Sequence, residues 1–578
     1  MKRAKLRIGM ARFLNSQLSV AGSVLVLPAL LFFAIFFAWP LVEIVSVSFT
    51  VSQVSRGTMP TAVLADPAHL GVLWFSLWQA ALSTVLTLAA GTPIAFAFAR
   101  YRFVGQRIWK ALAGVPFVMP TVVVAAAFSA LLGPRGAVNA ALQALFDLDQ
   151  PPIQLFGTLP MILLAHVFYN VAVVIRLVGG FLSAFNPGIE EAAASLGASR
   201  WQVIRYVSLP MALPSIGAAA ALIFLFTFTS FGVVLILGGA RFATLEVEIY
   251  RQTSQLLRLD VATSLALAQM VITLMVSWAS ARLEARASVP LEARRAGDVG
   301  KRPATLPARL LVIGSLGFIA VVLIAPLAAL LFRSLNLEGS HVLRYYSALS
   351  ENMRGSLFFV APQTAIRNSL AFALVTAALA MLMGLPLAYA IARGGGGQRP
   401  ESRHASPGAR LLNVLLLLPL GTSAVTLGLG FLVAFDRPPL DLRTSVVLLP
   451  VAHTLIALPF VVRSVLPAIR SFDPRLREAA RGLGAGPLQA LRHVDLPLLA
   501  APFAAAAIFA FAISLGEFGA SLLIARPEYP TMPLVIYRFL SQPGALNYGQ
   551  ALAMSSLLML VSAASALVIE RANEQIGR

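Results

Sequence analysis

A Glu-Ala-Ala triplet occurs twice in the sequence, each time followed by the same spacing of small and cyclic residues. In both copies a glycine stands six residues after the Glu, and Leu-Pro stands eighteen and nineteen residues after it. The triplets with their glycines are Glu191, Ala192, Ala193 and Gly197 in the first copy, and Glu478, Ala479, Ala480 and Gly484 in the second. Alanine side chains let another surface approach closely, and glycine permits a sharp turn between two short helices. This combination indicates a docking element rather than a catalytic centre.

The segment after each glycine carries apolar residues at roughly helical spacing among polar ones. They are Trp201, Val203, Ile204 and Val207 in the first copy, and Leu488, Leu491 and Val494 in the second. Such spacing predicts a short amphipathic helix, and the proline that follows restricts the chain where it enters the next apolar stretch. A single loop of this kind could simply lie on a lipid surface. Two loops with identical spacing favour binding to a partner protein.

A second set of candidates consists of polar residues inside apolar stretches, where an ionisable side chain costs about 2.5–3.5 kcal/mol at a helix centre. The strongest candidate is Glu517, because its counterpart in the repeat described below is the neutral Ser230. An acidic group in only one half of the repeat could bind a cationic solute or form a structural ion pair, and both possibilities remain open. The weaker candidates are His166, His453, Asn170 and Tyr169, together with Arg176 and Arg463 near helix ends.

Common catalytic and metal-binding patterns are absent from the sequence. There is no cysteine, which excludes disulfides, thiolate metal sites and cysteine nucleophiles. The six histidines form no His-x-x-x-His or His-Glu-x-x-His pair, and neither a Gly-x-Ser-x-Gly elbow nor a phosphate-binding Gly-x-x-x-x-Gly-Lys-Ser/Thr loop occurs. The four glycines at 394–397 are interpreted as a flexible loop. We expect a chain that is not an enzyme, has no metal site, binds no cofactor and lacks an ATPase of its own.

The composition places these residues in a membrane. Apolar residues make up 58% of the 578, and charged residues 12%, against about 25% in soluble domains. A membrane span needs about 20 mainly apolar residues, and the sequence predicts twelve, one of them centred near residue 421. The net charge of +20 fits basic cytoplasmic loops rather than nucleic-acid binding. We expect an all-α polytopic protein with an uncleaved first span and both termini in the cytoplasm.

The two halves of the chain repeat each other. An offset of 287 residues aligns His166 with His453 and Tyr250 with Tyr537, besides the two triplets and their glycines. A polar, basic and Pro-containing stretch at 286–307 separates the halves, so we predict domains at 1–285 and 308–578, with docking loops at 190–210 and 477–497. Six spans in each half make this a parallel repeat, and a transport pathway is expected where the halves face each other.

The doubled loop resembles the EAA loop of the membrane subunits of bacterial ABC importers, and the resemblance covers most of both halves. The usual Ile before x-Leu-Pro is replaced by Val207 and Val494. The resemblance implies a fused, double-length permease of the type I importer fold in the bacterial cytoplasmic (inner) membrane. It also implies two copies of a separate ATPase, which uses ATP and Mg²⁺, and an extracytoplasmic binding protein that delivers the solute. The glutamates of the triplets would then make the polar contact with the ATPase, the alanines the close packing, and Gly197 and Gly484 the turn.

A further resemblance narrows the range of possible solutes. The segments Leu164-Ala-His166-Val-Phe-Tyr-Asn170 and Leu237-Gly-Gly239, followed by Thr244, Glu246 and Ile249-Tyr250, are similar to thiamine permeases. Fused permeases of ferric-iron importers share the length and the doubled loop, so both solutes stay open. The alternative from another class is an ion-coupled secondary transporter. Such a transporter would carry repeated intramembrane carboxylates, whereas Glu517 has no acidic counterpart in the other half.

Overall fold

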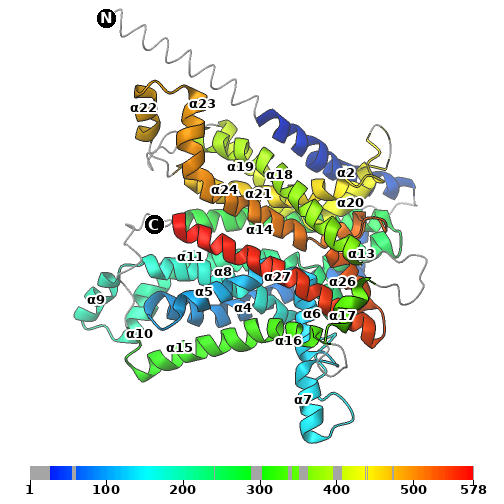
Figure 1. The fold of residues 1–578 in the computed structure, drawn as a ribbon, viewed down its shortest axis with the longest axis horizontal. Helices are drawn as coiled ribbons and strands as arrows, with labels where there is room; N and C mark the ends of the chain where they lie inside the picture. Colours follow the sequence, from blue (N-terminus) through cyan, green and yellow to red (C-terminus); the bar gives the residue numbers. More distant parts are fainter. Residues whose placement is uncertain are drawn as a thin grey trace, which may run out of the picture. The chain divides into compact units, whose positions relative to one another are not determined.

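The computed structural model describes residues 26–54, 60–239, 241–287, 302–335, 342–350, 362–394, 407–436, 438, 440–470 and 474–576, and their regular elements are helices (Figure 1). In this part of the chain eleven helices are long and apolar enough to cross a membrane. They are Val26–Phe49, Pro67–Arg100, Thr121–Phe146, Leu159–Ala184, Trp201–Phe228, Leu259–Leu283, Leu306–Ser334, Pro362–Ala392, Leu448–Arg470, Arg492–Gly516 and Ala545–Ile569. The all-α polytopic architecture is thereby confirmed.

The first half contains helices α2 to α14, which alternate long spans with short connecting helices. Their bounds are α2 Trp39–Val54, α3 Pro60–Ala65, α4 Pro67–Arg100, α5 Gln106–Gly114, α6 Thr121–Leu132, α7 Ala137–Phe146, α8 Leu159–Ala184, α9 Pro187–Ser195, α10 Arg200–Val203, α11 Leu209–Phe228, α12 Gly232–Leu237, α13 Leu245–Ser254 and α14 Leu259–Ala287. Local signals set the start of the long helix α4. Asp66 caps it by accepting a hydrogen bond from the Ala68 N–H at 2.8 Å, and Pro67 occupies the first helical position, where no N–H is needed.

The second half contains helices α15 to α27. Their bounds are α15 Leu306–Phe318, α16 Ala325–Ser334, α17 Arg344–Ser347, α18 Pro362–Gly394, α19 Pro407–Leu417, α20 Ala424–Ala434, α21 Leu448–Arg470, α22 Pro474–Gly482, α23 Pro487–Ala490, α24 Leu496–Gly516, α25 Gly519–Ile524, α26 Met532–Ser541 and α27 Ala545–Ile576. π-Helical turns occur at equivalent places in the two halves: Ala34–Ala38 corresponds to Ile319–Ile324, and Ile204–Ser208 to Leu491–Asp495. The sequence repeat is therefore also a repeat of local backbone structure.

At the span predicted near residue 421, the described residues form shorter helices in place of one helix of spanning length. The chain there forms α19, a tight 3₁₀ turn at Pro419–Gly421 and the 11-residue helix α20. Pro419 lacks a backbone N–H, and Ser423 caps a new helix by accepting from the Thr426 N–H at 2.9 Å, so the apolar run is divided. Eleven helical residues rise about 16 Å, roughly half of the hydrocarbon core of a bilayer.

The chain folds into two compact units that exchange segments between the sequence halves. The larger unit consists of the described residues in Val47–Ala365 and Thr531–Ala563, and the smaller unit of those in Met1–Ser46, Ile366–Pro530 and Ala564–Arg578. Within the larger unit, α15 packs on α4 and α16 on α6. Within the smaller unit, the rings of Phe36 and Trp39 lie 5.6 Å and 5.8 Å from that of Phe435. The first helix of each half thus belongs to the unit built mainly from the other half. Most of the predicted linker, 288–301, lies outside the described residues.

Each unit holds one pair of long helices at close range through equivalent glycines. A Cβ added to Gly91 on α4 would lie 2.7 Å from Val174 Cβ on α8, and one added to Gly384 on α18 would lie 2.8 Å from Val461 Cγ1 on α21. Both contacts leave no room for a larger side chain. The helices α8 and α21, which carry His166 and His453, are positioned by these contacts.

Candidate functional site

The first Glu-Ala-Ala segment forms a helix–turn–helix that leads into a span. Asn186 caps α9 by accepting from the Gly188 N–H at 3.0 Å, and the chain reverses after α9 at Gly197, whose φ is +88°. The short helix α10 and the π-helical turn Ile204–Ser208 then lead into α11. In Figure 1, α9 and α10 lie at the end of the bundle that contains α4, α8 and α11.

The second segment has the same geometry. Helix α22 is followed by Gly484 with a φ of +87°, then by α23, the π-helical turn Leu491–Asp495 and the span α24. A Cβ added to Gly197 or Gly484 would meet no atom within 4 Å. The glycines are therefore required by the left-handed backbone and not by lack of space. We call the segments 187–208 and 474–495, which contain most of the predicted loops, the first and second coupling loops, after the role that the resemblance implies for them.

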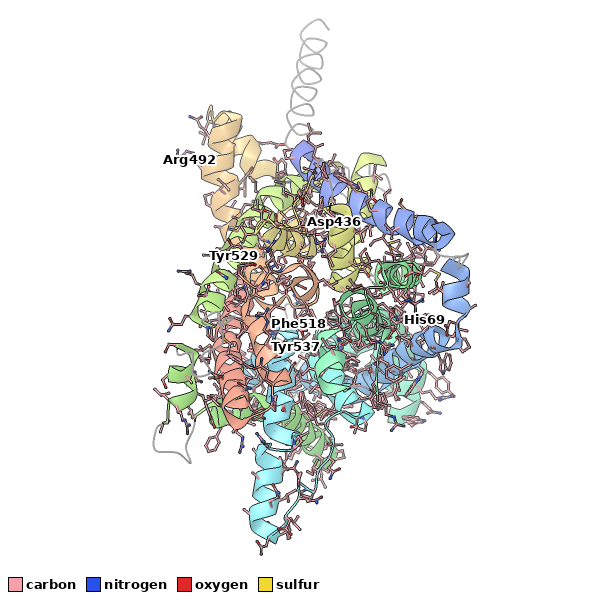
Figure 2. The ribbon with its side chains drawn as sticks, turned by 90° about the vertical axis from the view of Figure 1, so that its right-hand side faces the viewer. His69, Asp436, Arg492, Phe518, Tyr529 and Tyr537 are labelled. Atoms are coloured by element: carbon pink, nitrogen blue, oxygen red, sulfur yellow. The ribbon has the colours of Figure 1, made fainter. Side chains whose placement is uncertain are left out.

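The predicted contact residues lie at the surface of these loops. Glu191, Ala192, Glu478 and Ala479 are exposed, whereas Ala193 and Ala480 are half-buried. Figure 2 shows the exposed Arg492 on the outside of the second coupling loop. The exposure is compatible with docking, and the individual roles of these residues remain predictions.

The sequence analysis missed two residues of these surfaces. Leu196 and Leu483, which directly precede the two glycines, are each 90% exposed. A strongly exposed leucine at the same place in both loops is unusual for a surface that faces only water. The signal was present, since the two leucines align at the 287-residue offset, but only the structure shows that they point outward.

The first coupling loop is bound to a long helix through an ion pair. Arg100 Nη2, at the end of α4, lies 2.5 Å from Glu190 Oε1 on α9, and Ser208 Oγ donates to the same oxygen at 2.6 Å. Both charged side chains are largely buried, 13% and 23% exposed. The positions equivalent to Glu190 and Ser208 are Arg477 and Asp495, so the charge pattern of this contact differs between the halves.

The two repeat-related histidines are buried and bonded through both ring nitrogens. His166 Nδ1 lies 3.0 Å from Ser83 Oγ, and its Nε2 lies 2.9 Å from Ser230 Oγ. His453 Nδ1 lies 2.8 Å from Ser514 Oγ. Ser230, the neutral counterpart of Glu517, is thus a hydrogen-bond partner of His166.

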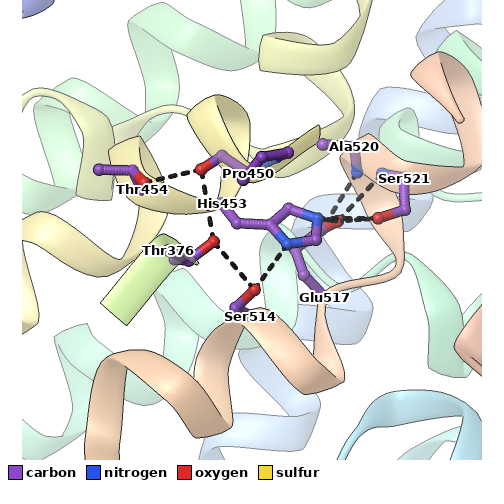
Figure 3. Close-up of polar contacts among 8 residues, drawn as sticks. All are labelled: Thr376, Pro450, His453, Thr454, Ser514, Glu517, Ala520 and Ser521. Atoms are coloured by element: carbon purple, nitrogen blue, oxygen red, sulfur yellow. Dashed lines mark hydrogen bonds and ion pairs between the residues drawn. The ribbon is translucent and has the colours of Figure 1, made fainter. Parts of the chain in front are cut away.

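Glu517 pairs with His453 (Figure 3). Its Oε2 lies 3.2 Å from His453 Nε2 and accepts from the N–H and the hydroxyl of Ser521 at 2.9 Å and 2.8 Å, while Oε1 accepts from the Ala520 N–H at 2.8 Å. On the other side of the ring, Ser514 donates to Thr376, so the Ser514 hydroxyl can accept from His453 Nδ1. This chain of donors suits a hydrogen-bonded histidine–carboxylate pair. Of the two possibilities for Glu517, the geometry has the features of the structural ion pair, and a place in the solute pathway remains a prediction.

The other predicted polar residues have local partners or lie at the surface. Asn170 Nδ2 donates to the His166 carbonyl at 2.9 Å, and Tyr169 OH donates to the Met119 carbonyl at 3.2 Å. Arg176 and Arg463 are exposed on α8 and α21. Within the described residues no group of three or more His, Cys, Asp or Glu side chains could hold a metal ion.

Comparison with known protein families shows to which family the chain belongs. The family model described as "Binding-protein-dependent transport system inner membrane component" matches residues 91–289 and, a second time, residues 384–575. The chain belongs to this family. The double match confirms the fused, double-length organisation, and each matched stretch contains one coupling loop. The protein is a multi-pass permease of an ABC importer in the inner membrane, a transport subunit and not an ion-coupled secondary transporter.

Individual permeases resemble the chain over most of its length. The probable ABC transporter permease protein y4fN of Sinorhizobium fredii is 27% identical over 86% of this chain and 87% of its own. The thiamine transport system permease protein ThiP of Escherichia coli is 27% identical over 86% of this chain and 90% of its own. The protein of the same name from Brucella abortus is 27% identical over 90% and 91% of the two chains. The likeness therefore extends across both halves of the permease.

Proposed function

We propose that this permease imports thiamine. The observation that carries the proposal is the likeness, over nine-tenths of both chains, to a permease named for thiamine transport. Thiamine is thereby favoured over ferric iron, the other solute that the sequence left open. Solute would reach the permease from an extracytoplasmic binding protein and cross the membrane within the helical bundles.

Two copies of a separate ATPase subunit would bind the two coupling loops. Supporting this are the equal backbone geometry at Gly197 and Gly484 and the exposed leucines before them. ATP and Mg²⁺ would bind to the ATPase, and the permease itself would bind no cofactor. Closure of the ATPase pair would move the loops, and the contact of Glu190 with Arg100 would transmit the movement of the first loop to α4.

The spans between each terminus and the coupling loop nearest to it support a cytoplasmic position for both termini. Four candidate spans precede the first coupling loop, and two begin at or after the second, at Arg492–Gly516 and Ala545–Ile569. An even number of crossings returns the chain to the side on which it began. Each end of the chain would therefore lie on the same side as the coupling loop nearest to it, where the ATPase binds.

The test is ATP hydrolysis and thiamine uptake by the permease reconstituted into proteoliposomes with its ATPase and a binding protein. We expect thiamine-loaded binding protein to stimulate hydrolysis in the wild type, and Glu191→Ala with Glu478→Ala to abolish the stimulation. Glu528→Ala, an exposed glutamate outside the loops, is the matched control and should behave as the wild type. Uptake driven by an ion gradient without the ATPase would contradict the proposal, and stimulation by another solute only would contradict the choice of thiamine.

A further inference from the structure

The turn between α4 and α5 carries three cations that are not used in ion pairs. Arg102, Arg107 and Lys110 are exposed, and among the described residues none of them lies in a salt bridge. The whole stretch 67–146 contains neither Asp nor Glu. On α5, residues three apart lie on the same side of the helix, so two of the cations share one side. The turn therefore presents positive charge outward.

Two aliphatic side chains lie among these cations and are also exposed. Val104 is 99% exposed and Ile108 is 66% exposed. The residues Gly-x-Arg-Ile at 105–108 correspond to Gly-x-Arg-Leu at 408–411 in the second half, where Leu411 is 59% exposed. A short helix with cations on one side and bare aliphatic side chains beside them is typical of a membrane–water boundary.

The shape of the turn does not depend on the cations. Gln106 Nε2 donates to the carbonyls of Phe98 and Tyr101 at 2.8 Å and 3.0 Å, which satisfies acceptors at the end of α4. The rings of Phe98 and Phe103 pack edge to face with their centroids 5.4 Å apart. Gly105 supplies the left-handed backbone of the turn, with a φ of +74°. The cations can therefore be replaced without removing a contact that holds the turn.

The turn lies where the chain passes from hydrocarbon to water. The 34 residues of α4 rise about 51 Å, more than the roughly 30 Å of a hydrocarbon core. Its last residue, Arg100, contacts Glu190 of the first coupling loop, so this end leaves the bilayer on the side of that loop. Helix α5 then returns and packs against the π-helical turn Ile319–Ile324, inside the span Leu306–Ser334.

We propose that residues 101–110 bind the headgroup of an anionic phospholipid, in the leaflet on the side of the coupling loops. The three cations bind the phosphate oxygens, and the two aliphatic side chains pack against the acyl chains. A cationic segment next to a span attracts anionic lipids, and free phosphate would leave the aliphatic side chains without a partner. Only the assignment of this leaflet to the cytoplasmic side rests on the proposed function, in which the ATPase binds the coupling loops.

The test uses Trp109, on α5 beside Ile108, as a reporter inside the site. The permease alone, without ATPase or solute, is reconstituted into vesicles of phosphatidylglycerol and phosphatidylcholine, with bromine on the acyl chains of one lipid or of the other. Bromine quenches the fluorescence of a nearby tryptophan, so the two series give the relative binding of the two lipids. Subtracting the signal of the Trp109→Phe variant isolates this residue from the other five tryptophans.

We expect the wild type to prefer phosphatidylglycerol at Trp109 by at least about tenfold, since one cation near the surface contributes about fivefold. The triple variant Arg102→Gln, Arg107→Gln, Lys110→Gln should reduce this preference to less than about twofold. Val104→Ser with Ile108→Ser should weaken quenching by both lipids and leave the preference unchanged.

The matched control removes the same charge from exposed positions outside the turn. Arg135, Arg241 and Arg258 are exposed, and none of them lies in a salt bridge among the described residues. Their replacement by Gln should leave the lipid preference at Trp109 as in the wild type. Such a result would show that local charge, and not the net charge of the chain, attracts the lipid.

Each outcome decides about the lipid site separately from the proposed function. If the wild type shows no preference, or the site variant and the control variant lose it equally, the lipid site is wrong, and thiamine uptake is unaffected by that result. If the site variant keeps the preference but no longer binds the ATPase, the turn belongs to the ATPase interface and the lipid site is again wrong. If the preference is found but the ATPase does not bind the coupling loops, the lipid site stands and the leaflet assignment fails with the proposed function.

Discussion

Gly197 and Gly484, 287 residues apart in the sequence, adopt the same left-handed backbone, with φ angles of +88° and +87°. Each follows a short helix that begins with proline and precedes a short helix that leads into a span. The two glycines lie in different compact units, and a Cβ at either position would meet no atom within 4 Å, so neither turn is imposed by lack of space. The agreement reflects a requirement that each loop meets on its own.

Replacing both glycines by alanine should impair coupling without unfolding the spans. A left-handed alanine costs about 1–2 kcal/mol per residue, so the loops would relax into another turn. We expect thiamine-stimulated ATP hydrolysis to fall at least about tenfold in the Gly197→Ala, Gly484→Ala variant. Gly482→Ala, two residues upstream at the end of α22 and without a left-handed φ, is the control and should retain activity. Equal activity of both variants would argue against a role for the turn.

The exposed leucines should be necessary for ATPase binding. Leu196→Asp with Leu483→Asp places charges where an apolar contact with the ATPase is expected. Each leucine that becomes buried in that contact would contribute about 1.5–3 kcal/mol to binding. We expect the ATPase to be lost from the purified complex, while the permease elutes from gel filtration unchanged. Leu145→Asp, on an exposed leucine of α7, should leave the complex intact. Retention of the ATPase by the double variant would show that the leucines lie outside the interface.

The ion pair between Arg100 and Glu190 should contribute both to stability and to coupling. In a double-mutant cycle with Arg100→Gln and Glu190→Gln, thermal denaturation should give an interaction energy of about 0.5–3 kcal/mol. The single variants should hydrolyse ATP but transport less thiamine per ATP, because the first coupling loop is no longer bound to α4. Additive effects in the cycle would indicate that the pair contributes nothing beyond its separate charges.

Glu517 should be required for the fold rather than for solute recognition. Glu517→Ala leaves the buried donors of Ser521 and Ala520 and the ring of His453 without their acceptor, so we expect a loss of about 3–5 kcal/mol of stability. Ser230→Ala, at the equivalent neutral position, should cost about 0.5–1.5 kcal/mol. Thermal denaturation checks both values. If Glu517→Ala is as stable as Ser230→Ala but binds thiamine less tightly, Glu517 belongs to the solute pathway after all.

The local features of this permease follow from short stretches of sequence. Apolar runs predicted eleven spans that the structure contains, because the length of a run and its lack of charge are enough to define a membrane helix. The predicted span near residue 421 is divided into shorter helices by Pro419 and a new helix cap at Ser423, where local turn chemistry outweighs hydropathy. The coupling loops were predictable because their glycines act through the backbone.

The partners of buried polar groups could not be read from the sequence in the same way. His453 and Glu517 are 64 residues apart, Arg100 and Glu190 are 90 apart, and Glu246 meets Gln269 from another helix. No periodicity encodes such contacts, since they depend on which helix faces rotate toward one another.

By itself, the sequence determined the membrane class, the internal repeat, the two coupling loops and the resemblance to ABC permeases, all of which rest on composition, spacing and local turns. Only the tertiary structure decided that the first helix of each half joins the other half's unit. It also decided that Glu517 is surrounded by donors, whereas Gln269 Oε1 and Gln79 Oε1 have no hydrogen-bond partner among the described residues. The physical reason is that burying a polar group without a hydrogen-bond partner costs free energy. Which groups find partners depends on packing between segments that are distant in the sequence.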